Sequence, residues 1–510
     1  MWSKEHEQGA EVRKIVWELV PYMRGTCVDL GCGPYKAFPH FIGVDNCKDT
    51  ELFGIQMKPN IRADVTSLHM FASGYFDCVF SSHTLEHIED YKGALKEWWR
   101  LVKPGGYLIL YLPHKDFYPN IGVEDANQDH KHDFIPSDIL EAVKEIATGF
   151  DLLENSERNE GKEYSFFQVY QKTQKRGHEE SWKKPKPEKT CAVVRYGAIG
   201  DNIQTSSIFP WLKEQGYHLT VYCQSGPGYE VLKHDPHIDK FIIQDKDAVP
   251  QDYLIEFWDY TAKKYDKWVN LSESVEGTLL AFPGRTNHYW ANHIRAKYLD
   301  RNYSEWVHEL AGVPLPLKPK FYSTLEEKAW ARKTANQWGK RNILWSLSGS
   351  SVHKSWPHLD VMVARIMLKY KDVHVVFVGD EFCKLLEQGW EKEPRCHLKS
   401  GEWSIRQSMA FAEVADLIIG TETGLLNAAG SMDADKIVTL SHSSEEMLTK
   451  HWKKVIPLKQ ETVGCPKQPC RQLHYGWDHC MKHEETGTAM CQFHIGPEQM
   501  WAAISGVLNG

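Results

Sequence analysis

The strongest constraint on the fold is a repeated pairing of a short β-branched run with a segment of helical period. TCVDL (26–30), TCAVVR (190–195) and NILWSL (342–347) are three of these runs, and each leads into a turn with a helical-period segment further on. Buried strands that alternate with helices are typical of parallel sheets. The pattern predicts an α/β chain built from several such blocks.

Two seams divide the 510 residues. Residues 171–190 are half charged, contain two prolines and have no aliphatic side chain, which is typical of a solvated linker. Residues 311–323 contain three prolines. At roughly 100–200 residues per domain, three domains are expected. We therefore predict four segments: a first domain at 1–170, a charged linker at 171–190, and two lobes at 191–323 and 324–510.

Composition narrows the class of partner. With a net charge of −8, the chain as a whole lacks the positive charge that proteins use to bind duplex nucleic acid. The first twenty residues are charged, unlike a signal peptide, and no run of about 18 apolar residues occurs to span a membrane. We expect a cytoplasmic chain, or one that rests on the inner face of a membrane through exposed Trp and Lys.

The first block carries the pattern of a nucleotide-type cofactor site. Its first strand ends at Asp29 and Leu30, and the turn Gly31-Cys32-Gly33 follows. Its second strand ends at Asp45. Such a turn lets a ligand approach backbone amides, and an acid at the end of the next strand can bind both ribose hydroxyls. A lone Gly-x-Gly is weak evidence, but Asp64 follows a third strand, and a fourth strand, a helix and Lys-Pro-Gly-Gly (103–106) come after it.

Over about residues 20–150 this block resembles the class I S-adenosylmethionine-dependent methyltransferases of type 11. The resemblance implies an S-adenosylmethionine cofactor. It places Asp29, Gly31 and Gly33 near the methionine part, Asp45 at the ribose and Asp64 at the adenine, with Ser81 and Ser82 lining the pocket. Only 12 positions separate Gly33 from Asp45. The helix usual between these strands is therefore expected to be short or absent, which opens one wall of the pocket.

Histidines supply candidates for acid–base chemistry in this block. His83 and His87 could face a substrate or simply pack. Residues 124–139 are rich in His and Asp and could form a metal site, an acceptor-side lid or a polar loop. Methyl transfer to a hydroxyl needs a base, and imidazole titrates near neutral pH. His130 and His132 are the predicted catalytic residues.

The stretch VVRYGAIGDNIQTSSIF (193–209) resembles a phosphate loop without the Gly-Lys-Ser/Thr ending of a P-loop. It places the carboxylate of Asp201 at the start of a helix. RYGAIGDNIQT, GSSVHKSWPH and GTETGLLNAAG occur in this order between residues 195 and 430. Residues 190–510 resemble the heptosyltransferase-like family, which has two Rossmann-like halves in the glycosyltransferase-B fold and uses a nucleoside-diphosphate sugar.

That resemblance implies a role for each loop. Asp201 would be the base that takes the acceptor proton in an inverting displacement, although Asp is also a preferred helix cap. The residues expected at the donor diphosphate are Ser350, Ser351, Lys354, Glu422, Thr423, Gly424 and Asn427. The family's third loop normally has Asp and His where this chain has Glu422 and Asn427. Phosphate contact would then be weaker, the donor would differ from ADP-heptose, or this half would only bind.

Four cysteines crowd the last 46 residues, namely Cys465, Cys470, Cys480 and Cys491. Their spacing is wider than the paired C-x2-C of most zinc sites. A zinc site, reduced structural thiols and disulfides all remain open from the sequence.

The leading hypothesis is a bifunctional glycan-modifying enzyme. One part transfers a sugar to a surface glycan or glycolipid such as lipopolysaccharide, and the other methylates a sugar hydroxyl. The alternatives are a methyltransferase whose C-terminal half only recognises a glycan or nucleotide, and a DNA-modifying enzyme. The acidic chain argues against the last of these.

Overall fold

The computed structural model describes residues 10–509 except 48–50, 53, 125, 246, 273–278, 280, 282–285, 316–318, 340, 350–353, 462–463 and 473–479. The chain forms two compact units. The first unit comprises residues 1–188 together with 243–264, and the second comprises 189–242 together with 265–510. No helix among the described residues is both long and apolar enough to cross a membrane.

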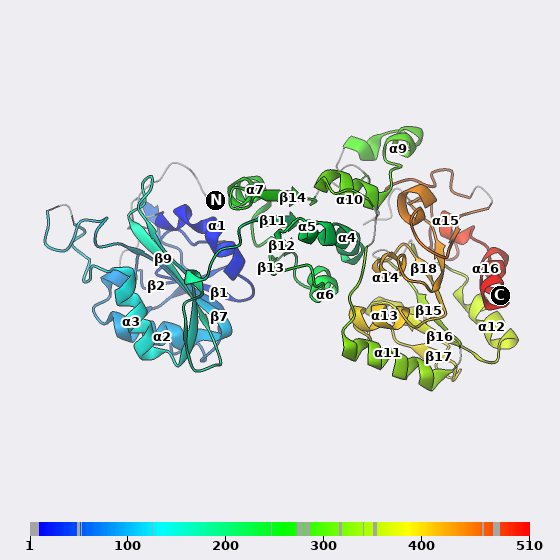
Figure 1. Ribbon diagram of the computed structural model, residues 1–510, viewed down its shortest axis with the longest axis horizontal. Helices are drawn as coiled ribbons and strands as arrows, with labels where there is room; N and C mark the ends of the chain where they lie inside the picture. Colours follow the sequence, from blue (N-terminus) through cyan, green and yellow to red (C-terminus); the bar gives the residue numbers. More distant parts are fainter. Residues whose placement is uncertain are drawn as a thin grey trace. The chain divides into compact units, whose positions relative to one another are not determined.

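The first unit is built around one mixed sheet (Figure 1). Its described strands are ordered β10-β8-β9-β7-β6-β1-β2-β5, and β9 runs antiparallel to both β7 and β8. Helices α2 and α3 pack together, and their apolar side chains, with Trp98 at the centre, join the core of the sheet. The elements are η1 (Glu11–Lys14), α1 (Val16–Leu19), η2 (Val20–Tyr22), β1 (Cys27–Leu30), β2 (Ile42–Asp45), β3 (Glu51–Leu52), β4 (Ile55–Gln56), β5 (Ile61–Arg62), β6 (Phe76–Ser82), η3 (Leu85–His87), α2 (Tyr91–Leu101), β7 (Val102–Pro113), α3 (Pro136–Ile146), β8 (Gly149–Arg158), β9 (Ser165–Lys172), β10 (Gly177–Glu179), η4 (Ser181–Lys183), η6 (Gln251–Tyr253) and α7 (Leu254–Ala262).

Two segments of this unit differ from what the sequence suggests. Part of the expected linker at 171–190 is ordered, because β10 pairs with β8 at the edge of the sheet and Ser181 donates to Asp151. Helix α7 comes from the second sequence block but is grouped with the first unit. It packs against α1, where Phe257 meets Trp17 and Tyr260 donates to Glu18 at 2.8 Å.

The second unit has two halves, each with its own parallel sheet. The first half has the strand order β13-β12-β11-β14. Its elements are β11 (Thr190–Val194), α4 (Ile199–Thr205), η5 (Ser206–Ile208), α5 (Phe209–Glu214), β12 (His218–Cys223), α6 (Pro227–Leu232), β13 (Lys240–Ile243), β14 (Lys267–Asn270), η7 (Thr286–Tyr289), α9 (Asn292–Tyr298) and α10 (Tyr303–Ala311).

The second half contains a six-stranded sheet in the order β17-β16-β15-β18-β19-β20. Numbered within the half, this order is 3-2-1-4-5-6, the Rossmann order. In Figure 1, α11 and α13 lie together on one face, and α12 and α16 lie on the other. The elements are α11 (Leu325–Trp338), β15 (Arg341–Ser346), α12 (Leu359–Lys369), β16 (Val373–Val378), η9 (Glu381–Leu385), β17 (Cys396–Leu398), α13 (Ile405–Ala412), β18 (Leu417–Thr421), α14 (Gly424–Ala429), β19 (Asp435–Thr439), η10 (Glu445–Thr449), β20 (Val455–Leu458), α15 (Met490–Phe493) and α16 (Pro497–Asn509).

The topology confirms the predicted α/β class, with one domain followed by two Rossmann-like halves. The last helix, α16, packs on its own half. Helix α16 buries Met500 and Ile504 in the core of its own half, and Tyr370 on the same half donates to Asn509. The apolar face of α16 is therefore buried in the core of its own half.

Candidate active sites

A large cavity opens at the carboxyl ends of β1, β2 and β6 in the first unit. Its volume is about 1290 Å³. Pockets for drug-sized ligands are usually about 300–1,000 Å³, so this one has room for a nucleoside-sized cofactor and a second molecule. Of the predicted site residues, it is lined by Asp29, Gly31, Gly33, Asp45, Ser82 and His130.

The turn after β1 depends on glycine at position 31. Its φ is +71°, and a Cβ there would lie 2.2 Å from Oγ1 of Thr84. Any side chain would therefore be strained and would collide. The preceding Asp29 is 2% exposed, and its Oδ2 accepts a 2.8 Å hydrogen bond from the Ala37 amide. Burial raises the pKa of Asp29 to about 7, against the opposing effects of that hydrogen bond and of Lys36.

Asp45 ends β2 beside the same turn. Its Oδ2 accepts from the Gly33 amide at 3.1 Å, and its Oδ1 accepts from the Cys47 amide at 2.8 Å. No helix lies between Gly33 and Asp45, a stretch described without gaps, which confirms the prediction of a missing helix. The wall that such a helix would form is left to loops.

Three predicted residues lie outside the lining of this cavity. Asp64 accepts hydrogen bonds from the amide and hydroxyl of Thr66. Ser81 is fully buried and donates to the carbonyl of Leu30, where it ties β6 to β1. His132 is half-buried, and its Nε2 lies 3.0 Å from the backbone oxygen of Glu89. The structure thus separates His130 from His132.

Sequence reasoning missed Glu86. It lies on η3, is fully buried, and lines the cavity beside His87 and His130. Burial raises the pKa of Glu86 to about 8, and burial lowers that of His130 to about 4. The signal was present in HTLEH (83–87), where the acid directly precedes a histidine already singled out.

In the second unit, Asp201 is the third residue of α4 and closes a capping arrangement. Its Oδ2 accepts from the Ala198 amide at 2.7 Å. Its Oδ1 lies 3.0 Å from the buried guanidinium of Arg195 and accepts from the Tyr303 hydroxyl at 2.6 Å. The carboxylate keeps about a quarter of its surface exposed. Each of its oxygens has a further lone pair, so it can still accept a proton.

The first and third predicted loops meet through α4 and α14. A Cβ on Gly200 would lie 2.9 Å from Nδ2 of Asn427, and one on Gly424 would lie 2.3 Å from Cγ2 of Ile199. Gln204 donates to Oδ1 of Asn427 at 2.8 Å. Because both glycines lack a side chain, the starts of the two helices can touch. Asn427 joins the two halves in this structure.

Lys354 and Glu422 form the polar centre of the second half, at the point where the strand order reverses between β15 and β18. The buried Nζ of Lys354 donates to the backbone oxygen of Glu422 at 3.2 Å. Burial lowers the pKa of Lys354, and the carboxylates of Glu422 and Asp201 oppose that shift. Ligands bind at such switch points in open parallel sheets.

Both carboxylate oxygens of Glu422 already accept hydrogen bonds within the protein. Its Oε1 accepts from the amides of Ser441 and Ser443, both at 2.9 Å, and its Oε2 accepts from the Ser441 hydroxyl at 2.5 Å. Burial raises the pKa of Glu422, but His442, Lys354 and these hydrogen bonds outweigh it and hold the pKa at about 2. Burial also lowers the pKa of His442 to about 4. Nε2 of His442 lies 3.3 Å from Oε2 of Glu422. The carboxylate organises the loop, and Thr423 caps α14.

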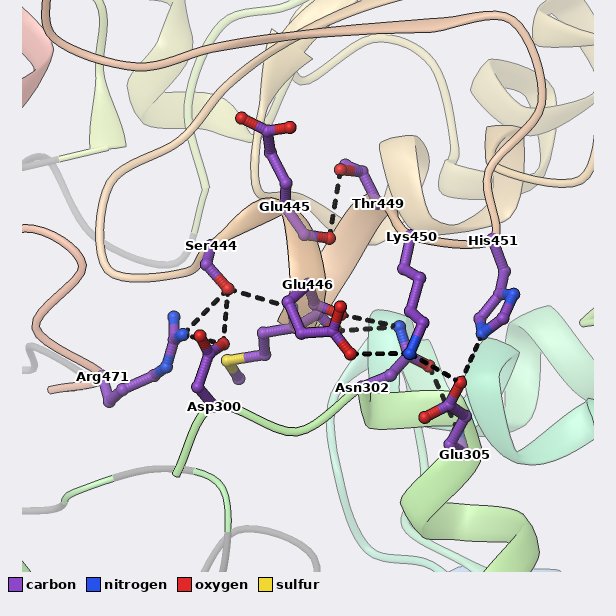
Figure 2. A network of polar contacts seen from close by, with 11 residues as sticks. Asp300, Asn302, Glu305, Ser444, Glu445, Glu446, Thr449, Lys450, His451 and Arg471 are labelled. Atoms are coloured by element: carbon purple, nitrogen blue, oxygen red, sulfur yellow. Dashed lines mark hydrogen bonds and ion pairs between the residues drawn. The ribbon is translucent and has the colours of Figure 1, made fainter. Parts of the chain in front are cut away.

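Figure 2 shows the polar network that joins the start of α10 to the segment after β19. Asn302 donates to the backbone oxygen of Glu446 at 3.0 Å, and Lys450 and His451 both pair with Glu305. The buried Arg471 pairs with Asp300. Tyr303, the partner of Asp201, is the first residue of α10. The network therefore fixes the helix that holds the candidate base.

The comparisons with known proteins can be set beside this geometry. Residues 28–110 match the family model described as a methyltransferase domain. The chain carries a methyltransferase domain. The match runs from β1 into β7 and includes Asp29, Asp45 and Glu86. Among curated proteins, none matches the sequence.

Three solved structures are similar to parts of the chain. ADP-heptose LPS heptosyltransferase II of E. coli is 15% identical, with a TM-score of 0.44, over 63% of this chain and 98% of its own. A family 9 glycosyl transferase of Veillonella parvula is 15% identical, with a TM-score of 0.45, over 63% and 97%. A SAM-dependent methyltransferase of Archaeoglobus fulgidus is 16% identical, with a TM-score of 0.24, over 32% and 94%.

The remaining predicted residues fall in two places. Ser350 and Ser351 lie outside the described residues.

One small cavity of about 20 Å³ near the C-terminus is lined by all four predicted cysteines, namely Cys465, Cys470, Cys480 and Cys491. None of the twelve cysteines, all of which are described, forms a disulfide. Burial raises the pKa of Cys470 to about 12 and of Cys480 to about 11, and the neighbouring thiols add to both shifts.

Proposed function

We propose that the protein is a bifunctional glycan-modifying enzyme. The methyltransferase domain transfers a methyl group from S-adenosylmethionine to a sugar hydroxyl. The second unit transfers a sugar from a nucleoside-diphosphate sugar to a surface-glycan acceptor, with inversion. Two sites on one chain raise the local concentration of the first product at the second site.

The methyl-transfer proposal rests on the cavity. Gly31 and Gly33 line the cavity without a side chain, so a cofactor can approach the backbone there, and Asp45 offers carboxylate oxygens to ribose hydroxyls. Asp29 would meet the ammonium group of the methionine part. The space left in about 1290 Å³ suits a sugar acceptor.

The sugar-transfer proposal rests on one observation: helix α4, which carries Asp201, touches the start of α14, which directly follows the loop that Lys354 contacts. Asp201 would take the acceptor hydroxyl proton as the oxygen attacks the anomeric carbon. Lys354 would face the leaving diphosphate, whose negative charge grows as the bond breaks. The amide of Gly424, at the start of α14, would add a hydrogen bond to a phosphate oxygen.

An assay of the full chain tests both activities. Nucleoside-diphosphate sugars would be incubated with a glycan acceptor, and the released nucleoside diphosphate would be measured. Labelled S-adenosylmethionine would be offered to the same acceptor in parallel. Label in the acceptor together with acceptor-dependent nucleotide release supports the proposal. Methyl transfer without nucleotide release favours the second candidate, a C-terminal half that only recognises a glycan or nucleotide. Asn427 favours that candidate, because its Oδ1 accepts from Gln204 and its Nδ2 donates to the backbone oxygen of Thr423, which occupies both ends of the side chain.

We propose that the four C-terminal cysteines hold a structural zinc ion. Their cavity of about 20 Å³ is the size that a single small ion or water needs. Burial and the neighbouring thiols raise the pKa of Cys470, Cys480 and Cys491, and a bound cation would stabilise these groups as thiolates. Metal analysis of the purified chain, with Cys470→Ser beside it, tests this: the variant should lose the zinc. Equal zinc in both would contradict the assignment.

A further inference from the structure

One wall of the methyltransferase cavity gathers three groups that have no role in holding S-adenosylmethionine. Oε1 of Glu86 lies 3.8 Å from Nε2 of His87 and 4.0 Å from Nε2 of His130. One potential ligand atom from each residue lies within 4.8 Å of the others. The two imidazole rings meet edge to face, with centroids 4.8 Å apart. All three residues line the cavity.

Glu86 makes this cluster unusual. Its side chain is fully buried, and neither carboxylate oxygen has a hydrogen-bond partner. A buried carboxylate without hydrogen bonds is costly unless a cation compensates it. The backbone around it is held firmly, because the Glu86 carbonyl accepts hydrogen bonds from the amides of Lys131 and His132. The loop that carries His130 is thereby anchored to the short helix that carries Glu86 and His87.

We propose that Glu86, His87 and His130 bind a divalent cation that takes the acceptor hydroxyls in the methyltransferase cavity. Two imidazoles and one carboxylate suit Mn²⁺, Fe²⁺, Co²⁺ or Zn²⁺ and leave the remaining coordination positions open. Those positions face the cavity, where two adjacent hydroxyls of a sugar can chelate the ion. The assignment of the acceptor as a vicinal diol rests on the proposed methyl transfer. The proposed binding of a cation is independent of that function.

The geometry needs a small adjustment. Ligand atoms about 2.1 Å from a metal lie about 3 Å apart when they occupy adjacent positions. The nitrogens are now 3.8 and 4.0 Å from the Glu86 oxygen, so each must approach by about 1 Å. His87 has a third of its side chain exposed, which leaves its ring room to rotate.

The ion would act on the acceptor oxygen. Coordination lowers the pKa of a bound hydroxyl, and its proton leaves to solvent. The oxygen then forms a bond to the methyl carbon while the bond between that carbon and the sulfonium sulfur breaks. Neutral S-adenosylhomocysteine is the other product. The sulfonium charge is cancelled and one proton is released, so the step is balanced.

The test is a Mn²⁺ titration of the full chain after metal removal, with free Mn²⁺ followed by electron paramagnetic resonance. Mn²⁺ prefers oxygen and nitrogen ligands, so the four C-terminal thiols compete weakly. We expect saturable binding in the unmodified chain and an affinity about tenfold lower or worse in Glu86→Gln and in His130→Ala. His132→Ala, on the same loop but outside the cavity, should bind Mn²⁺ as the unmodified chain does.

Calorimetry with S-adenosylhomocysteine on each protein serves as the folding control. Unchanged affinity for it in the variants shows that a loss of Mn²⁺ binding is local. If either variant loses this affinity, His87→Gln, at the partly exposed ligand, replaces it. Saturable Mn²⁺ binding that survives in Glu86→Gln, or no saturable binding in the unmodified chain, would overturn the proposal. A chain that binds Mn²⁺ but not S-adenosylhomocysteine would instead contradict the methyl-transfer function.

Discussion

The hydroxyl of Tyr303 donates a 2.6 Å hydrogen bond to Oδ1 of Asp201, and the guanidinium of Arg195 lies 2.5 Å from the same hydroxyl. The carboxylate is thus oriented by two side chains and by the amide of Ala198 at its other oxygen. A residue that only capped a helix would need the amide contact alone. The additional contacts favour a positioned base.

Asp201→Asn should abolish sugar transfer while nucleotide affinity stays within a few-fold. Asparagine keeps one accepting oxygen in place of two and cannot take a proton, so a loss of about 10²–10⁴-fold is expected. Initial rates and nucleotide titration measure the two effects. Tyr303→Phe is the matched comparison and should lose much less, because it removes only one orienting contact. Transfer in Asp201→Asn within a few-fold of the unmodified rate would reduce Asp201 to a helix cap.

Asp45→Ala should weaken S-adenosylhomocysteine binding by at least about tenfold, since hydrogen bonds to a charged group contribute about 1.5–3 kcal/mol. Asp64→Ala is the control, because the Asp64 carboxylate binds Thr66 outside the cavity. Calorimetry of both variants separates the two positions. If Asp64→Ala loses affinity for S-adenosylhomocysteine and Asp45→Ala does not, Asp45 is not the carboxylate that binds the ribose.

Asp29→Asn should change how stability depends on pH. The pKa of Asp29 is raised from 3.8 to about 7 in the folded chain, so the unfolded chain releases this proton at lower pH. Stability from this group is present below pH 4 and is lost as the pH rises towards 7. Asparagine keeps the Ala37 hydrogen bond without the charge. We expect Asp29→Asn to gain roughly 1–3 kcal/mol relative to the unmodified chain between pH 5 and pH 8.

The measurement is thermal unfolding at both pH values. Because ligands stabilise the unit that binds them, the transition that S-adenosylhomocysteine shifts in the unmodified chain belongs to the methyltransferase unit. Parallel pH curves for Asp29→Asn and the unmodified chain would mean that Asp29 titrates in the fold as it does in water.

Asp300→Asn should destabilise the second unit by about 2–4 kcal/mol, because it leaves the buried guanidinium of Arg471 without its anionic partner. Asp433→Asn breaks the exposed pair with Lys453 and should cost less than about 0.5 kcal/mol. Urea unfolding of both variants gives the comparison. Equal effects would show that the network in Figure 2 adds no more than a surface ion pair.

Much of the fold could be predicted because buried parallel strands leave a direct mark on the sequence. The runs CVDL (27–30) and NILWSL (342–347) are mostly apolar, and the structure forms β1 and β15 there. The absence of a helix before Asp45 could be predicted because only 12 positions separate Gly33 from Asp45. The ordering of β10 could not, because its three exposed residues join the edge of the sheet through backbone hydrogen bonds that no side-chain pattern reports.

The sites were predictable where the backbone itself carries the signal, as at Gly31. They were not predictable where tertiary packing decides. His130 and His132 are equivalent in sequence, yet the amides of Lys131 and His132 bind the Glu86 carbonyl, and only His130 lines the cavity. The burial of Glu86 and the contact of Asn427 with Gln204 likewise depend on segments that are distant in the chain.

The central claim is that one chain holds a methyl-donor site and a separate nucleotide site. Calorimetric titration of the full chain with S-adenosylhomocysteine, and then with ADP, UDP, GDP and CDP in turn, tests it most directly. The account predicts that S-adenosylhomocysteine and one nucleoside diphosphate each bind with unit stoichiometry. Saturation with either ligand should leave the affinity of the chain for the other unchanged. Binding of S-adenosylhomocysteine alone, or competition between the two ligands for one site, would contradict it.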